Sequence, residues 1–105
     1  MPLRVLVIDD ERNIRLTLPA LVQSLGHEAQ AAATAAEAEA ALQTLPFDLV
    51  LLDLKLGSTS GLDLLPRLLE LSPGLPIVLM TAFASIPTAV EAMRRGARDY
   101  LPKPF

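Results

Sequence analysis

The stretch DLVLLD, residues 48–53, decides the fold class of this chain. Four apolar residues follow one another without interruption, and an aspartate stands on either side of them. A continuous apolar run of this length is typical of a strand in the middle of a parallel sheet, because helices cover both faces of such a sheet. We therefore expect a buried central strand at residues 49–52, with Asp53 at its carboxyl end.

Further strands and helices alternate on both sides of this run. Strands are predicted at residues 4–8, 28–32, 77–80 and 97–101, of which the alanine-rich second one carries the weakest signal. Segments of helical period lie between them, at residues 13–25, 34 to about 44, 60 to about 71, and 85–96. We expect Pro66 to bend or weaken the third helix, because proline lacks an amide donor. The alternation of strand and helix specifies the α/β class, with a parallel sheet and helices on both faces.

Composition limits the classes of function. The chain has 105 residues, of which 51% are hydrophobic and 20% charged, so we expect one compact domain, residues 1–105. Charged residues interrupt the leucine-rich middle too often for a membrane span, and no signal peptide is recognisable, so a cytoplasmic location is expected. The chain has no cysteine, which excludes disulfides, zinc–thiolate sites and thiol nucleophiles. The net charge of −3 argues against direct binding of nucleic acid.

Polar residues gather where the predicted strands end. The first strand is followed by Asp9, Asp10 and Glu11, the third by Asp53, the fourth by Thr81 and the fifth by Lys103. Ligands of open α/β sheets bind beyond the carboxyl ends of the strands, so these side chains are the candidate site.

The chemistry of this set points to phosphate. Carboxylates this close together need a counter-charge, and an all-oxygen ligand set suits Mg²⁺. An aspartate beside such an ion can attack phosphorus as a nucleophile. In that arrangement Thr81 can donate a hydrogen bond to a phosphoryl oxygen, and Lys103 can neutralise another.

In these motifs the chain resembles a receiver domain of a two-component response regulator. The matching pieces are the aspartate pair after RVLVI, the aspartate that ends DLVLLD, the Thr-Ala pair after IVLM, and DYLPKPF near the end. The resemblance extends over residues 3–105. The stretches DLKLGSTSGLDLL and TAFASIPTAVEAMRRGARDYLPKPF are most similar to receivers of the nitrogen-regulator group, which usually precede an ATPase that activates sigma-54 polymerase. The chain departs from the common pattern at Gly57, where many receivers have proline, and at Ser60.

The resemblance implies a fold and a mechanism. The fold would be flavodoxin-like, a doubly wound five-stranded parallel sheet of order 2-1-3-4-5. Asp53 would accept a phosphoryl group from a phosphohistidine of a sensor histidine kinase. Mg²⁺ would be held by Asp10, Asp53 and the main-chain carbonyl of Lys55, with Asp9 assisting.

The resemblance also implies a switch and its consequences. The Thr81 hydroxyl would move toward the phosphate and the Tyr100 ring would turn inward, which changes the surface of the fourth helix and fifth strand. Family members commonly dimerise or hold an output domain there, and an output domain in transcription regulation would lie beyond Phe105. Such a domain is not an enzyme beyond its own phosphoryl transfer and autodephosphorylation.

Other readings of the same residues stay open. In these readings Asp9 and Asp10 serve simply as helix caps, Lys103 is a solvated loop lysine, and Tyr100 is part of the core. The chain could be a dimerisation module that works without phosphorylation. A phosphohydrolase of the haloacid-dehalogenase type also uses an aspartate at the end of a central strand, but such enzymes carry a second aspartate two residues on, where this chain has Lys55.

The chain is shorter than the receiver domains that it resembles. A receiver normally continues into a fifth helix, so this chain is expected to be truncated after its fifth strand. We predict an exposed apolar strip flanked by the first helix, covered by a neighbouring chain or causing self-association.

Overall fold

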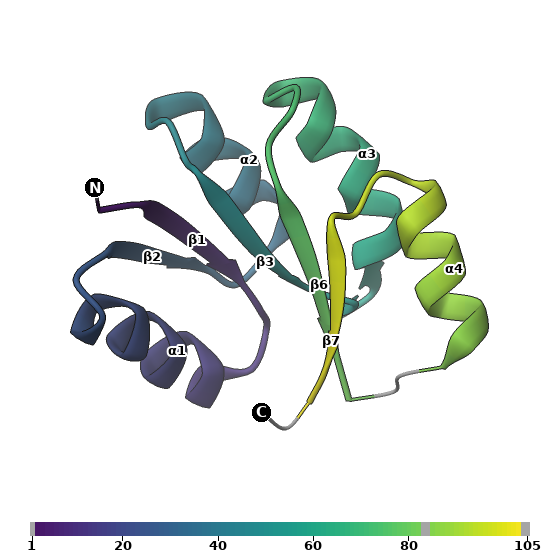
Figure 1. The fold of residues 1–105 in the computed structure, drawn as a ribbon, viewed down its shortest axis with the longest axis horizontal. Helices are drawn as coiled ribbons and strands as arrows, with labels where there is room; N and C mark the ends of the chain where they lie inside the picture. The colour runs from purple at the N-terminus through teal and green to yellow at the C-terminus, as the bar shows by residue number, and fades with distance from the viewer. Residues whose placement is uncertain (1, 83–84, 104–105) are drawn as a thin grey trace.

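A five-stranded parallel sheet forms the centre of the molecule, as a computed structural model of the chain shows for residues 2–82 and 85–103 (Figure 1). Its strands are β1 (Arg4–Ile8), β2 (Glu28–Ala32), β3 (Leu49–Asp53), β6 (Ile77–Thr81) and β7 (Asp99–Pro102). Their spatial order is β2-β1-β3-β6-β7, with every neighbouring pair parallel. This is the predicted flavodoxin-like order, and the predicted α/β class is confirmed.

Helices cover both faces of this sheet (Figure 1). On one face lies α1 (Arg12–Ser24), and on the other lie α2 (Ala35–Thr44), α3 (Gly61–Leu71) and α4 (Ile86–Arg94). Among the described residues, no helix has the length and apolar character needed to cross a bilayer.

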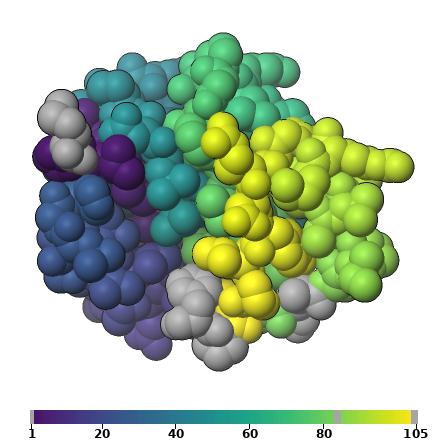
Figure 2. Space-filling model, viewed as in Figure 1, coloured from purple at the N-terminus to yellow at the C-terminus, as the bar shows by residue number. Residues whose placement is uncertain are grey.

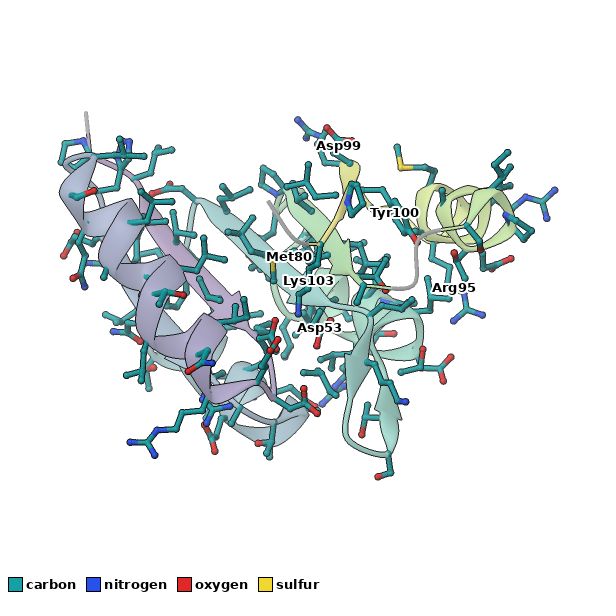
Figure 3. The ribbon with its side chains drawn as sticks, turned by 90° about the horizontal axis from the view of Figure 1, so that it is seen from below. Asp53, Met80, Arg95, Asp99, Tyr100 and Lys103 are labelled. Atoms are coloured by element: carbon teal, nitrogen blue, oxygen red, sulfur yellow. The ribbon has the colours of Figure 1, made fainter. Side chains whose placement is uncertain are left out.

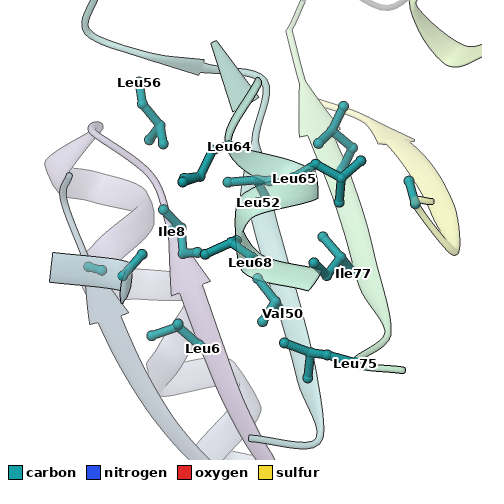
Figure 4. Close-up of a cluster of buried hydrophobic side chains, with 14 of the residues drawn as sticks. Leu6, Ile8, Val50, Leu52, Leu56, Leu64, Leu65, Leu68, Leu75 and Ile77 are labelled. Carbon is teal, nitrogen blue, oxygen red and sulfur yellow. The ribbon is translucent and has the colours of Figure 1, made fainter. Parts of the chain in front are cut away.

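The main core lies between the sheet and the α2–α3 side (Figure 4). The inward residues of β3, Val50 and Leu52, are fully buried, and so are Leu65 and Leu68 of α3. Burial of apolar area at about 25 cal/mol per Å² makes this the main source of stability. It also fixes the strand positions, and therefore the place where each strand ends.

Three helices begin at a hydroxyl residue that caps them. Thr34, Ser60 and Ser85 accept hydrogen bonds from backbone amides inside α2, α3 and α4 respectively. Such caps satisfy amides that have no partner in the first helical turn.

Pro66 does not interrupt α3, which runs continuously from Gly61 to Leu71. Proline has no N–H for the carbonyl four residues earlier, that of Leu62. Arg95 fills this place, because its guanidinium donates to the Leu62 oxygen at 2.9 Å. Arg95 also pairs with Asp63 at 2.8 Å and so ties α4 to α3.

Two local predictions need correction. Residues 55–60, to which the sequence pattern assigned no strand, contain a small hairpin of β4 (Lys55–Leu56) and β5 (Thr59–Ser60), because Leu56 packs into the core. The last strand begins at Asp99 rather than at residue 97, because Ala97 still donates a hydrogen bond to Ala92 and closes α4.

Part of the sheet is visible beside α1 (Figure 2). Surface of β3 is visible between α1 and β7 in this view. Leu101 of β7 is 39% exposed, and Leu16 and Leu21 of α1 are 59% and 55% exposed. Apolar surface thus lies beside α1, where the sequence predicted it, and the covering partner stays a prediction.

Candidate functional site

The carboxyl ends of β1, β3, β6 and β7 meet at one edge of the sheet because the strands are parallel. A depression of about 320 Å³ opens there. Its lining residues are Asp10, Glu11, Asp53, Lys55, Thr81, Ala82 and Lys103. Residues from four separate segments of the sequence are thus brought together.

Three carboxylates form the floor of the site. One oxygen from each of Asp9, Asp10 and Asp53 can be chosen so that all three lie within 4.8 Å of one another. Asp9 is fully buried and Asp53 is only 6% exposed, whereas Asp10 faces solvent. Carboxylates at such spacing repel one another unless a cation lies among them.

Lys103 supplies part of that positive charge (Figure 3). Its Nζ lies 2.7 Å from Asp9 Oδ2, 3.5 Å from Asp53 Oδ1 and 3.6 Å from Glu11 Oε2. The loop that carries it is held to β6, because the Lys103 amide donates to the Thr81 carbonyl at 2.7 Å. The prolyl residue before it ends β7.

One lysine does not balance the charge around Asp53. Burial and the charge of Asp9 raise the pKa of Asp53 from 3.8 to about 6, although Lys103 and the Lys55 backbone amide act in the opposite direction. Burial alone would lower the pKa of Lys103, but its contacts with Asp9, Asp53 and Glu11 outweigh burial and raise it. The site therefore has a surplus of negative charge and a lysine that stays protonated.

A divalent cation fits this surplus. The carboxylates of Asp10 and Asp53 offer hard oxygen ligands at an open rim, the kind of site that Mg²⁺ or Ca²⁺ uses. Lys55 begins β4 two residues after Asp53 and also lines the depression.

Asp10 makes a contact that the sequence did not indicate. Its Oδ2 accepts a hydrogen bond of 2.8 Å from the backbone amide of Gly57, at the tip of the β4–β5 hairpin. Gly57 has φ +59°, a conformation that glycine adopts readily. No motif in the sequence pairs residues 47 positions apart.

Thr81 and Tyr100 lie on neighbouring strands but in different surroundings. Thr81 ends β6 and is 1% exposed. Tyr100 is half-buried, and its hydroxyl is hydrogen-bonded to Thr88 Oγ1 of α4 at 3.0 Å (Figure 3). Thr88 also donates to the Ser85 carbonyl, so Tyr100 contacts the capped start of α4. Thr88 was missed from the sequence, although its place three residues after Ser85 is a capping position.

Comparison with known proteins places the chain in a family. Residues 5–105 match the model of the response regulator receiver domain. The chain is 43% identical over 101 residues to the alginate biosynthesis transcriptional regulatory protein AlgB of Pseudomonas aeruginosa. It is 40% identical over 101 residues to the DNA-binding transcriptional regulator NtrC of Azospirillum brasilense. These alignments cover 96% of this chain but only 22% and 21% of the relatives, so the chain spans about a fifth of their length.

Solved structures support the same family. A response regulator from Burkholderia pseudomallei, with a phosphorylated aspartic acid, calcium ion and citrate, superimposes with TM-score 0.92 at 37% identity, covering 97% of this chain and 60% of that one. The beryllofluoride-activated NtrC4 receiver domain dimer superimposes with TM-score 0.90 at 35% identity, covering 97% and 84%. The chain therefore belongs to the response regulator receiver domain family, and within it resembles the receivers of NtrC-type regulators, the sigma-54 activator group.

Proposed function

We propose that Asp53 accepts a phosphoryl group from a phosphohistidine of a sensor histidine kinase. The observation that carries this proposal is the position of Asp53, a nearly buried carboxylate at the end of a central strand that still lines an open depression. Lys103 lies 3.5 Å from it, and Thr81 lines the same depression. A phosphorylated aspartic acid in the Burkholderia relative supports the assignment.

The proposed transfer uses these side chains directly. A carboxylate oxygen of Asp53 forms the new bond to phosphorus while the bond from phosphorus to the histidine nitrogen breaks, and that nitrogen leaves with its electron pair. Lys103 neutralises one phosphoryl oxygen, and the Thr81 hydroxyl donates to another. Hydrolysis of the acyl phosphate returns Asp53 to its starting state, so the domain acts on itself and turns over no external substrate.

Mg²⁺ is the proposed cofactor, and Asp10, Asp53 and the Lys55 carbonyl would hold it, with Asp9 assisting. The ion would neutralise charge that develops on the phosphoryl oxygens. The calcium ion of the Burkholderia relative supports a divalent site of this kind. Within this chain, Asp9 is fully buried and bonded to Lys103 and to the Glu11 amide, so it acts by holding Lys103 and by its charge.

Signalling would run from the phosphate to α4. In the proposed switch, Thr81 turns toward the phosphoryl group and the Tyr100 ring moves inward, which breaks its hydrogen bond to Thr88. The outer face of α4 carries exposed Ile86, Val90 and Met93, at 81%, 50% and 49% exposure. A change at the start of α4 would alter this face, which suits self-association or contact with an output domain.

The partners follow from the same proposal. A sensor histidine kinase in the cytoplasm would supply the phosphoryl group, and a transcription-regulating output domain would read the switch. The dimeric, beryllofluoride-activated receiver of NtrC4 supports self-association of the activated form. The names of AlgB and NtrC support a role in transcription.

The two alternatives have weaker support. A module that dimerises without phosphorylation does not need the raised pKa and open depression at Asp53. A phosphohydrolase of the haloacid-dehalogenase type needs a general acid two residues after the nucleophile, and Lys55 stands there.

The test is covalent modification by a small phosphodonor. With acetyl phosphate and Mg²⁺, the chain should gain the mass of one phosphoryl group, and borohydride reduction should mark Asp53 in the peptide map. Asp53→Asn should gain no mass, while the control Asp63→Asn, at an exposed carboxylate of α3, should react like the wild type. Modification of Asp53→Asn to the same extent, or none of the wild type, would contradict the proposal.

A further inference from the structure

Leu56 and Gly61 attach the base of the β4–β5 hairpin to the fold. Leu56 of β4 is 5% exposed and packs into the core, and the Gly61 amide donates to the Leu54 carbonyl at the base of the hairpin at 2.6 Å. These contacts fix the hairpin where it leaves β3. They do not fix its tip, residues 57 and 58, which are exposed.

The tip is held through the site itself. The Gly57 amide donates to Oδ2 of Asp10 at 2.8 Å, which joins the hairpin to the end of β1. A hydrogen bond from an amide to a carboxylate is stronger than one between neutral groups. Because it engages one oxygen of Asp10, it also sets the direction in which the other oxygen points.

We propose that the Gly57 amide is a positioning group for the divalent cation. It would orient the Asp10 carboxylate and hold the Lys55 backbone, two residues earlier on the same hairpin, beside the acidic cluster. Groups that hydrogen-bond to metal-binding carboxylates raise affinity by fixing the ligands before the ion arrives. This inference rests on the proposed cation site, and it adds a residue that touches neither the ion nor the phosphoryl group.

The residue type matters at this position. A proline at 57, as many receivers have, has no N–H to donate, and its ring cannot adopt φ near +59°. Asparagine keeps the N–H and tolerates left-handed backbone better than other side chains do. The space beside Gly57 is open, since an added Cβ would meet nothing within 4 Å. Gly57→Pro therefore removes the amide donor and also changes the backbone conformation, whereas Gly57→Asn keeps both.

The first experiment is a Mg²⁺ titration of both variants and the wild type, followed by amide chemical shifts of the rim residues. Gly57→Pro should bind Mg²⁺ about tenfold more weakly than wild type. This is the lower end of the range seen when a group that hydrogen-bonds to a metal ligand is removed. Gly57→Asn should bind as the wild type does.

The second experiment needs neither metal nor a proline variant. Without Mg²⁺, Asp10→Ala should move the Gly57 amide proton upfield and speed its exchange with deuterium, compared with wild type. An unchanged Gly57 signal would overturn the inference even if Gly57→Pro fails to fold.

The outcomes separate the two proposals. Equal Mg²⁺ affinity of Gly57→Pro and Gly57→Asn would overturn the positioning role and leave the cation site intact. Absence of Mg²⁺ binding by the wild type would instead overturn the cation site in the proposed function, while phosphorylation of Asp53 by acetyl phosphate would still be decided by its own mass measurement.

Discussion

The middle of the sheet and its carboxyl-terminal rim are built from the same strands but have opposite character. In β3, Val50 and Leu52 are fully buried among apolar side chains, and Asp53, one residue further, is almost as buried among charges. In β1, fully buried Ile8 is followed by fully buried Asp9 in the same way. The strand middles therefore supply stability, whereas holding charges close together at the strand ends costs some of it.

Substitutions in the apolar core at the strand middles should change stability most. Leu68 of α3 is fully buried against the sheet, so Leu68→Ala should lower the free energy of unfolding by about 2–5 kcal/mol, measured by urea denaturation. The control Leu21→Ala, at a leucine of α1 that is 55% exposed, should change stability far less. Equal losses of unfolding free energy at the two positions would contradict this expectation, because the buried core would then contribute no more than an exposed leucine.

At the rim, a substitution that removes charge should raise the free energy of unfolding rather than lower it. The pKa of Asp53 is about 6 in the fold and 3.8 for an ordinary aspartate, so the folded state holds the proton more tightly than the unfolded state does. The contribution of Asp53 to stability is therefore fully present below about pH 4 and is lost as the pH rises through about 6. By pH 7.5, Asp53→Asn should be more stable than wild type by up to about 3 kcal/mol, and near pH 4 the two should differ little.

Urea denaturation of both proteins across this pH range measures the effect. Glu70→Gln, at an exposed carboxylate of α3, serves as a control that should show no such pH-dependent gain. If Asp53→Asn were less stable than wild type at pH 7.5, the rim would stabilise the fold, contrary to the comparison.

The smallest effect is expected where the rim contacts α4. Tyr100→Phe removes the hydroxyl that bonds to Thr88, a neutral hydrogen bond worth about 1 kcal/mol, and should lower stability by no more than that. Chemical shifts of residues 85–90 should move, while those of β1 and β3 should not. A loss as large as that of Leu68→Ala would mean that Tyr100 is mainly a core residue.

Much of this picture could be predicted from the sequence. The sequence predicted β1 and β2 with their observed bounds and β3 and β6 to within one residue, and the helices that begin after Thr34, Ser60 and Ser85 were expected at those positions. The rim could be listed because polar residues follow the apolar runs and parallel strands end at one edge.

What sequence could not predict depends on contacts between distant residues. The β4–β5 hairpin has only two residues in each strand, so it has no periodicity to detect. The bond from Gly57 to Asp10 and the guanidinium of Arg95 at the Leu62 carbonyl both join segments that only the fold brings together. The local sequence pattern does not indicate such contacts.

The carboxyl-terminal rim of the sheet is proposed to hold surplus negative charge for a cation and a phosphoryl group. The direct test is the difference in free energy of unfolding between Asp53→Asn and wild type at pH 7.5 as Mg²⁺ is added. Wild type should gain about 2.7 kcal/mol at a Mg²⁺ concentration one hundred times its Kd. Asp53→Asn, which lacks one charged ligand, should gain much less, so its advantage should shrink toward zero. Equal gains in both proteins, or none in either, would contradict the account.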